Sequence, residues 1–163
     1  MAEQYFAQTG DDLPGKDQVL SMSGLEFMEA ILNGALPAPP IAKLLNYRLE
    51  EVSQGHILFR GTPGFDHFNP VGTVHGGWYG TVLDSAMACA VMTTVPKGSV
   101  YTTLEYKVNI VRAIPEGMRV DIQGEVSHAG RSTGVANGWI RGTEDGRVYA
   151  TGSTTCLIMK IDD

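Results

Sequence analysis

The chain has 163 residues, of which 43% are hydrophobic and 18% are charged, so it can bury a real core and is neither disordered nor fibrous. Its formal net charge of −6 argues against a general nucleic-acid-binding protein, because neutralising phosphates needs clustered Lys and Arg. The two Cys residues give neither a disulfide framework nor metal-ligand spacing, and the acidic N-terminus does not resemble a signal peptide, so we expect a cytoplasmic protein.

Residues 1–43 are predicted to be an N-terminal extension to a single domain that spans residues 44–163. Residues 1–20 are expected to be loosely held. Ser23 and Glu26 form a capping-box pattern, which predicts a short amphipathic helix that ends near Asn33. The proline-rich segment that follows, PAPPIAKLLN, permits a short helical turn.

Two strands joined by a hairpin turn are predicted within residues 47–63, because the hydrophobic period changes to two at Tyr47. A long apolar helix is expected next, from about Val74 to Thr93. Asp84 lies inside this segment and a His-Gly-Gly sequence begins it. These polar and flexible residues favour a buried core helix over a membrane span.

Four more strands are predicted after the helix, in residues 101–114, 118–130, 132–143 and 147–161. The tight Gly-containing turns between them indicate antiparallel neighbours. An α+β architecture follows, with five to six antiparallel strands curled around one long helix, and it explains why that helix is apolar nearly all round. The sheet edges and the remaining side of the helix would be open, so we expect self-association to close them.

Small residues gather on one side of the long helix when it is drawn as a helical wheel, namely Gly77, Gly80, Thr81, Asp84 and Ala88. Small side chains permit close approach by a neighbouring backbone or by a ligand. Two interpretations therefore stay open. The stripe is either a tight dimer contact in which Asp84 caps a group of the partner, or one wall of a substrate site.

The start of the helix favours the substrate site. The free N–H groups of Gly76 and Gly77 at a helix N-terminus are suited to bind an oxyanion. Asn69 and His75 precede these glycines, and Asp84 follows, which makes the pattern more specific than His-Gly-Gly alone.

Helix geometry limits how these groups could cooperate. Gly76 and Asp84 are eight residues apart, which is about 12 Å along one helix. A carboxylate at that distance cannot act on a carbonyl that is held at Gly76 of the same helix. If both residues serve one reaction, they come from different subunits whose helices run antiparallel.

Several segments, NPVGTVHGGWYGTVLDSAMACA, TTLEYKVNIVRAI, HAGRS and DGRVYATGSTT, resemble the hotdog-fold acyl-CoA thioesterases. The resemblance is to the phenylacetate-pathway (PaaI-like) branch, which includes one class of 4-hydroxybenzoyl-CoA thioesterases, and it spans roughly Leu44 to Ile158. It implies a hotdog fold, active sites at the interface of a homodimer, and dimers that pair into a homotetramer. The expected activity is hydrolysis of an acyl-CoA thioester, without a metal, an organic cofactor, a nucleic acid or a membrane as partner.

The resemblance also implies roles for individual residues. The N–H of Gly76 would polarise the thioester carbonyl, and Asp84 of the partner subunit would be the nucleophile or the base that activates water. Asn69 would position water or substrate, and His75 would orient the thioester or assist the departing thiolate. Thr103 occupies the place where the family has a Ser or Thr near the attacking water.

Substrate contacts are expected from Gly77, Trp78, Arg131 and Ser132. Arg131 is the best candidate for a phosphate of coenzyme A, although a solvated hairpin Arg is an equally good interpretation. Trp78 either lines the acyl site or packs at the interface. Ala88 stands where many family members have Gly, which would narrow the acyl pocket, and the sequence leaves the acyl group itself open.

Two other functions are compatible with the same fold. A hotdog hydratase or dehydratase would pair a His with a carboxylate in a different motif, and no such motif is visible. A non-catalytic acyl-CoA sensor would usually carry a DNA-binding segment, whereas residues 1–40 are acidic and lack a helix-turn-helix pattern. Both alternatives rank below the thioesterase.

Overall fold

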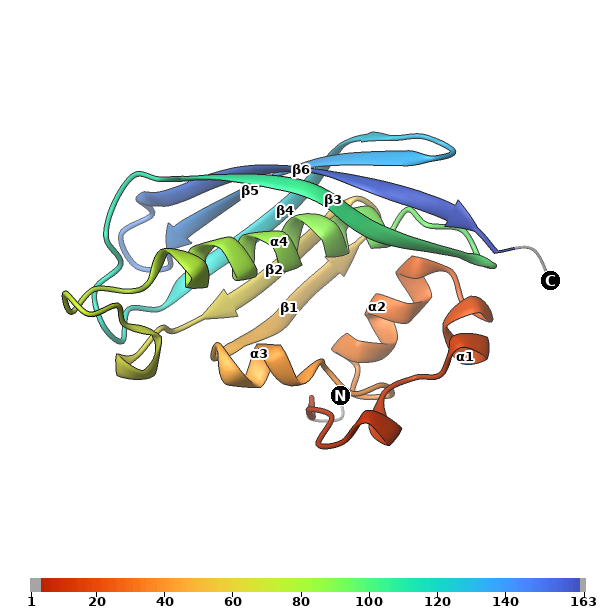
Figure 1. The fold of residues 1–163 in the computed structure, drawn as a ribbon, viewed down its shortest axis with the longest axis horizontal. Helices are drawn as coiled ribbons and strands as arrows, with labels where there is room; N and C mark the ends of the chain where they lie inside the picture. Colours follow the sequence, from red (N-terminus) through yellow and green to blue (C-terminus); the bar gives the residue numbers. More distant parts are fainter. Residues whose placement is uncertain (1–3, 162–163) are drawn as a thin grey trace.

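A computed structural model describes residues 4–161, in which the segments of period two form one sheet and the apolar segment forms the long helix beneath it (Figure 1). The sheet order is β1-β2-β4-β5-β6-β3 and every neighbouring pair is antiparallel, so β1 and β3 are its edges. The predicted α+β architecture is confirmed. The elements are β1 (Tyr47–Ser53), β2 (His56–Gly61), α4 (Gly76–Met92), β3 (Ser99–Ile110), β4 (Val120–Ala129), β5 (Thr133–Gly142) and β6 (Val148–Lys160).

Side-chain caps fix both ends of α4. The Nδ1 atom of His75 accepts a hydrogen bond from the N–H of Gly77 at 2.8 Å, so the helix begins at Gly76, close to the start predicted near Val74. At the other end, the hydroxyl of Thr93 donates to the carbonyl of Ala90 at 2.6 Å, which satisfies a carbonyl that the last helical turn leaves unpaired.

Glycines on the strands let α4 lie very close to the sheet. A Cβ atom at Gly124 of β4 would collide with the backbone carbonyl of Ala86, and one at Gly138 of β5 would lie 2.7 Å from the Cγ of Met87. Gly152 of β6 faces the same Met87 side chain. Three adjacent strands therefore present backbone rather than side chains to one stretch of the helix.

The N-terminal extension is folded onto the rest of the chain, and residues 4–20 are part of it rather than the loosely held segment that was predicted for residues 1–20. Its helices are α1 (Lys16–Leu20), α2 (Gly24–Leu32) and α3 (Pro40–Leu44). The capping box at the start of α2 is confirmed, since the Ser23 N–H donates to the Glu26 carboxylate at 2.7 Å. Ahead of α1, Phe6 forms a β-bridge with Ala38; residues 1–3 lie outside the described part of the chain.

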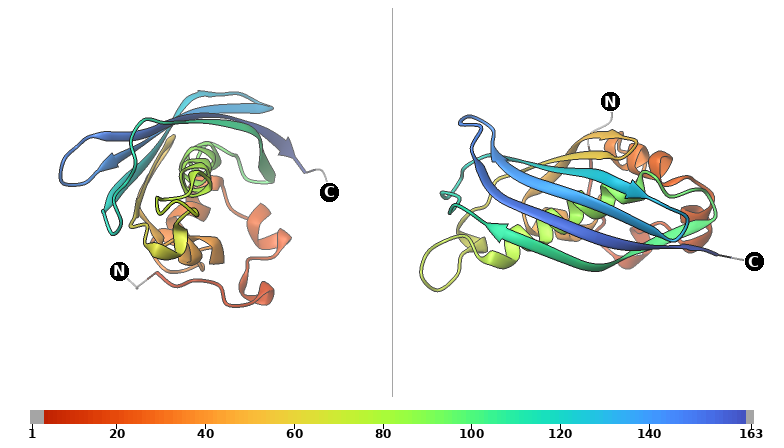
Figure 2. Two further views of the ribbon diagram at one scale, coloured as in Figure 1. Left: turned by 60° about the vertical axis from the view of Figure 1, so that its left-hand side comes forward. Right: turned by 90° about the horizontal axis from the view of Figure 1, so that it is seen from above.

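The helix α2 covers part of α4 on the side away from the sheet. The N–H of Gly24 donates to the carbonyl of Val95 at 2.9 Å, and a Cβ atom at Gly24 would collide with the carbonyl of Met92. In the left view of Figure 2, α4 is seen nearly end on, with the sheet above it and the helices of the extension below. The side of α4 that we expected a partner subunit to close is thus partly closed within one chain.

The edge strand β3 remains unpaired on one side and carries exposed apolar side chains. Leu104, Tyr106 and Ile110 are 58%, 47% and 49% exposed. The strand is irregular at Leu104, because its register with β6 shifts between Thr103 and Glu105. No helix within residues 4–161 has the combination of length and apolarity needed to cross a bilayer.

Replacing Gly124 with Ala should destabilise the protein by roughly 1–3 kcal/mol, because the new methyl group can be accommodated only by moving α4 away from β4. Thermal and urea unfolding would measure the change. The matched control is Gly64→Ala, since no atom lies within 4 Å of a Cβ at that position and its φ of −120° suits alanine. Equal losses of stability in the two variants would contradict this account of the helix–sheet contact.

Candidate active site

The loop before α4 is held together by Asn69. The Oδ1 of Asn69 accepts hydrogen bonds from the N–H groups of Val71 and Thr73 at 3.1 and 3.2 Å, and its Nδ2 donates to the Thr73 hydroxyl at 2.8 Å. Only the second Nδ2 hydrogen is left for another partner. Asn69 therefore shapes the loop that delivers His75 to the start of the helix.

The first turn of α4 leaves one N–H group available. Because the Gly77 N–H is bonded to His75, it is not free, contrary to the expectation that both glycines offer their N–H groups. The N–H of Gly76 has no hydrogen-bond partner within residues 4–161. Both glycines are exposed, so a ligand atom can reach the Gly76 N–H at the positive end of the helix dipole.

The bond to Gly77 also determines which ring nitrogen of His75 accepts and which can donate a hydrogen bond. A ring nitrogen that accepts a hydrogen bond carries no proton, so Nδ1 is unprotonated and the neutral ring carries its proton on Nε2. The exposed Nε2–H is then a donor at the mouth of the helix.

Two turns further along the helix, Asp84 is partly buried between α4 and β3. Its Oδ1 accepts a hydrogen bond from the hydroxyl of Thr103 at 3.0 Å. Burial raises the pKa of the Asp84 carboxyl, and the Thr103 hydroxyl partly offsets this by stabilising the charged form. The combination makes Asp84 a stronger base than an ordinary surface aspartate.

The stripe of small residues on α4 has a neighbour in its own chain. A Cβ atom at Gly80 would lie 3.3 Å from the hydroxyl of Tyr106, and one at Gly76 would lie 3.6 Å from the Cδ1 of Ile110. Both neighbours belong to β3. The absence of side chains at these positions lets β3 pass close to the first two turns of the helix.

The structure thus pairs Asp84 with Thr103 but keeps Gly76 apart from them. Both Gly76 and Asp84 lie on the unbroken helix α4, so about 12 Å separates them along its axis. Within residues 4–161, no group of three or more His, Cys, Asp and Glu side chains could hold a metal ion.

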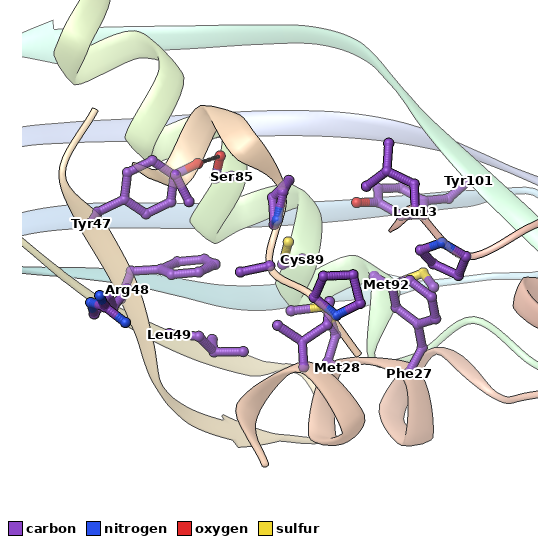
Figure 3. A pocket seen from close by; sticks show the side chains of 17 residues that line it. Leu13, Phe27, Met28, Tyr47, Arg48, Leu49, Ser85, Cys89, Met92 and Tyr101 are labelled. Atoms are coloured by element: carbon purple, nitrogen blue, oxygen red, sulfur yellow. Dashed lines mark hydrogen bonds between the residues drawn. The ribbon is translucent and has the colours of Figure 1, made fainter. Parts of the chain in front are cut away.

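An apolar cavity of about 330 Å³, lined in part by Ser85, the residue after Asp84, was not predicted from the sequence. It lies between α2, β1 and α4, and Figure 3 shows side chains from these elements converging on it. At one end the hydroxyls of Tyr47 and Ser85 are 2.9 Å apart and share a hydrogen bond. One feature of the sequence could have indicated this cavity. Ser85, Cys89 and Met92 follow the spacing i, i+4 and i+7, which puts them on one helix face.

A family model of the thioesterase superfamily matches residues 71–150, which include α4 and β3. Residues 71–150 therefore belong to the thioesterase superfamily. No curated protein sequence matches it. Among solved structures, it is similar to a phenylacetic acid degradation-related protein of Ralstonia eutropha JMP134, with 26% identity, a TM-score of 0.73, and coverage of 80% of this chain and 98% of the other.

Two further solved structures have the same fold. One is a thioesterase family protein of Silicibacter pomeroyi, with 26% identity, a TM-score of 0.69, and coverage of 75% of this chain and 90% of the other. The second is a hypothetical thioesterase of Streptococcus pneumoniae TIGR4, solved with coenzyme A, with 26% identity, a TM-score of 0.66, and coverage of 76% and 93%.

The structure also places the other three expected substrate contacts, Trp78, Arg131 and Ser132. Trp78 is buried in its own chain, where its Nε1–H donates to the carbonyl of Leu45 at 2.9 Å, so the structure places it in a packing role. Arg131 and Ser132 are exposed in the turn between β4 and β5. The register aligns Gly134 with Cys156 and Cys156 with Thr103, so this turn lies at the end of the sheet away from Gly76.

The pKa of Asp84 offers a test that does not depend on any activity. A carbon-detected NMR titration should show Asp84 with a pKa above its ordinary range. Thr103→Val should raise that pKa further, because it removes the hydroxyl that favours the carboxylate. Thr102→Val is the matched control, since Thr102 is exposed and the next residue along a strand points to the opposite face. An Asp84 that titrates at or below its ordinary range would contradict the proposed environment.

Proposed function

We propose that this chain is an acyl-CoA thioesterase that acts as a homodimer, with each active site built from Gly76 of one subunit and Asp84 of the other. The observation that carries the proposal is the partly buried Asp84, whose pKa is raised and whose Oδ1 is held by Thr103. Membership of residues 71–150 in the thioesterase superfamily supports the reaction class. The similar pneumococcal protein solved with coenzyme A supports the thiol part of the substrate.

Each participating group has a definite task in the reaction. The N–H of Gly76 donates to the thioester oxygen, which becomes negatively charged as the carbonyl carbon is attacked. In one route, Asp84 of the partner subunit takes a proton from water and the hydroxide adds to that carbon. The carbon–sulfur bond then breaks, and coenzyme A leaves as a thiolate that needs no strong acid. Direct attack by the carboxylate, followed by hydrolysis of the anhydride, gives the same products.

The supporting residues fit this scheme. Thr103 fixes one carboxylate oxygen of Asp84, which leaves the other oxygen to face water. His75 has its Nε2–H directed away from the cap bond to Gly77, where it can donate to the thioester or to the departing sulfur. Asn69 acts by holding the preceding loop, and its one remaining Nδ2 hydrogen is available to water. Arg131 is proposed to contact a phosphate of coenzyme A.

The edge strand β3 is the proposed dimer contact. It presents unpaired backbone groups on its free side, together with the exposed side chains of Leu104, Tyr106 and Ile110. An antiparallel pairing of two β3 edges would continue the sheet through the dimer and bring the two α4 helices close in opposite directions. Pairing of such dimers would give the homotetramer expected from the family resemblance.

Asp84→Asn should lower kcat by at least about 10²-fold, because it removes the water-activating or nucleophilic group while keeping the size of the side chain. Release of coenzyme A from a panel of acyl-CoA substrates would be followed with a thiol reagent. The variant should be as stable as the wild type at neutral pH, because burial no longer opposes a charge at this position. Near-normal turnover would make Asp84 an interface residue rather than a catalytic one.

The shared site can be tested by mixing two inactive variants. Gly76→Pro removes the free N–H, and the structure tolerates proline there because Gly76 is the first helical residue and His75 has the extended ψ of 138°. Gly76→Ala is the matched control, because it keeps the N–H and its Cβ makes an ordinary contact 3.6 Å from Ile110. It should stay active where Gly76→Pro does not.

Mixed dimers of Asp84→Asn and Gly76→Pro should regain one intact site, which contains Gly76 from one subunit and Asp84 from the other. Random mixing makes half of the dimers mixed, so activity should recover to roughly a quarter of wild type. Subunit exchange would be verified with differently tagged copies. Verified mixed dimers that stay inactive would show that the two residues do not share a site.

A further inference from the structure

The apolar cavity and the Asp84–Thr103 pair share two structural elements, α4 and β3. Ser85, which lines it, directly follows Asp84 on α4, and Cys89 and Met92 continue the lining along the same helix face. On β3, Tyr101 lines the cavity two residues before Thr103, and alternate residues of a strand share a face. Two elements therefore lead from the Asp84–Thr103 pair into the cavity.

The opposite wall comes from the N-terminal extension. Phe27, Met28 and Ile31 of α2 line it, together with Ala42 of α3. Figure 3 shows Phe27 and Met28 extending from α2 toward the space that Cys89 and Met92 border from α4. Without the extension this side of the cavity would be open to solvent.

With the exception of Arg48, the lining is uncharged at neutral pH. Burial raises the pKa of the Tyr47 hydroxyl to about 12 and that of the Cys89 thiol to about 12, and it raises the pKa of Tyr101 well above its usual range. Arg48 alone among the described lining residues is charged. Its guanidinium lies over the ring of Phe6, 4.9 Å from the ring centroid, and donates to the carbonyl of Gln4 at 3.3 Å.

The size of the cavity limits what it can hold. If each non-hydrogen atom occupies about the 30 Å³ of a water molecule, a volume of about 330 Å³ accommodates roughly ten atoms. A long fatty acyl chain exceeds this space, and an acetyl group leaves most of it unfilled. The flexible side chains of Met28 and Met92 allow small adjustments of shape.

We propose that this cavity receives the acyl group of the substrate, that the preferred group is neutral, apolar and of medium size, and that the N-terminal extension sets its length. The proposal rests on the thioesterase function proposed above and adds the substrate class to it. The thioester carbonyl would lie at Asp84, with the acyl group running along α4 toward Met92 and between α4 and α2.

The first test is a substrate profile of the full-length protein. Straight-chain acyl-CoA substrates from acetyl to palmitoyl should show the highest kcat/KM at medium length, near octanoyl. Phenylacetyl-CoA should also be accepted. Succinyl-CoA should be poor, because its carboxylate would enter an apolar cavity in which Arg48, the charged lining residue, is already held against Phe6 and the carbonyl of Gln4. A maximum at acetyl, at palmitoyl or at succinyl would overturn the proposal while leaving the thioesterase function intact. Failure to hydrolyse any acyl-CoA would instead refute the proposed function.

The second test changes the size of the cavity by substituting lining residues of the N-terminal extension. Ala42→Leu and Ile31→Phe fill it from two different helices and should reduce kcat/KM for octanoyl-CoA about tenfold relative to acetyl-CoA, as expected if about two methylene groups lose their buried place. Met28→Ala enlarges it and should move the preferred length to longer chains. Ala35→Leu is the control, because Ala35 is exposed and does not line the cavity.

Thermal unfolding of each variant distinguishes a loss of the folded structure from a change in the preferred acyl-chain length. A folded filling variant that lowers kcat/KM equally for acetyl-CoA and octanoyl-CoA would overturn the proposal, and so would a shift of the same size in Ala35→Leu. Using two filling variants and one enlarging variant keeps the test decisive if any one of them fails to fold.

Discussion

The close contact between α4 and the glycine-bearing strands determines where the candidate site residues of α4 lie. Because Gly124, Gly138 and Gly152 present no side chains, the helix rests almost directly on the backbone of the sheet. Such contact gains dispersion and burial around Ala86 and Met87 and fixes the rotation of the helix about its own axis. Once that rotation is fixed, Asp84 is directed toward β3 and Ser85 toward Tyr47 of β1 and the cavity.

The same packing explains the electrostatics of the site. A helix that is apolar nearly all round leaves a carboxylate little water, so the pKa of Asp84 rises unless another group stabilises its charge. The structure supplies one hydroxyl, from Thr103, and within residues 4–161 no cationic side chain forms an ion pair with Asp84. A full ion pair would stabilise the carboxylate more strongly and make it a weaker base. The single hydrogen bond orients the group while leaving its basicity high.

Local patterns predicted local structure well. The Ser23–Glu26 capping box, the hairpin turn around Gly55 and the strand periods all concern residues that are near one another in the chain. The packing of the extension could not be predicted in this way, because its contacts join distant residues, such as Gly24 with Val95. The small residues of α4 were ambiguous for the same reason, since nothing in the sequence shows that Tyr106 lies against Gly80.

The candidate site has two parts, the residues assigned to the chemistry and the residues that line the proposed acyl cavity. The match to the thioesterase superfamily covers residues 71–150, and these contain Gly76, Asp84 and Thr103, the groups assigned to the chemistry. Most of the proposed acyl cavity is lined by residues 13–59, which lie before that match. A family resemblance can therefore indicate the bond that is broken without indicating the acyl group. Only the folded chain joins the two parts, because α4 contributes Asp84 to one and Ser85, Cys89 and Met92 to the other. Substrate choice can then change through the extension while the residues that hold the thioester stay in place.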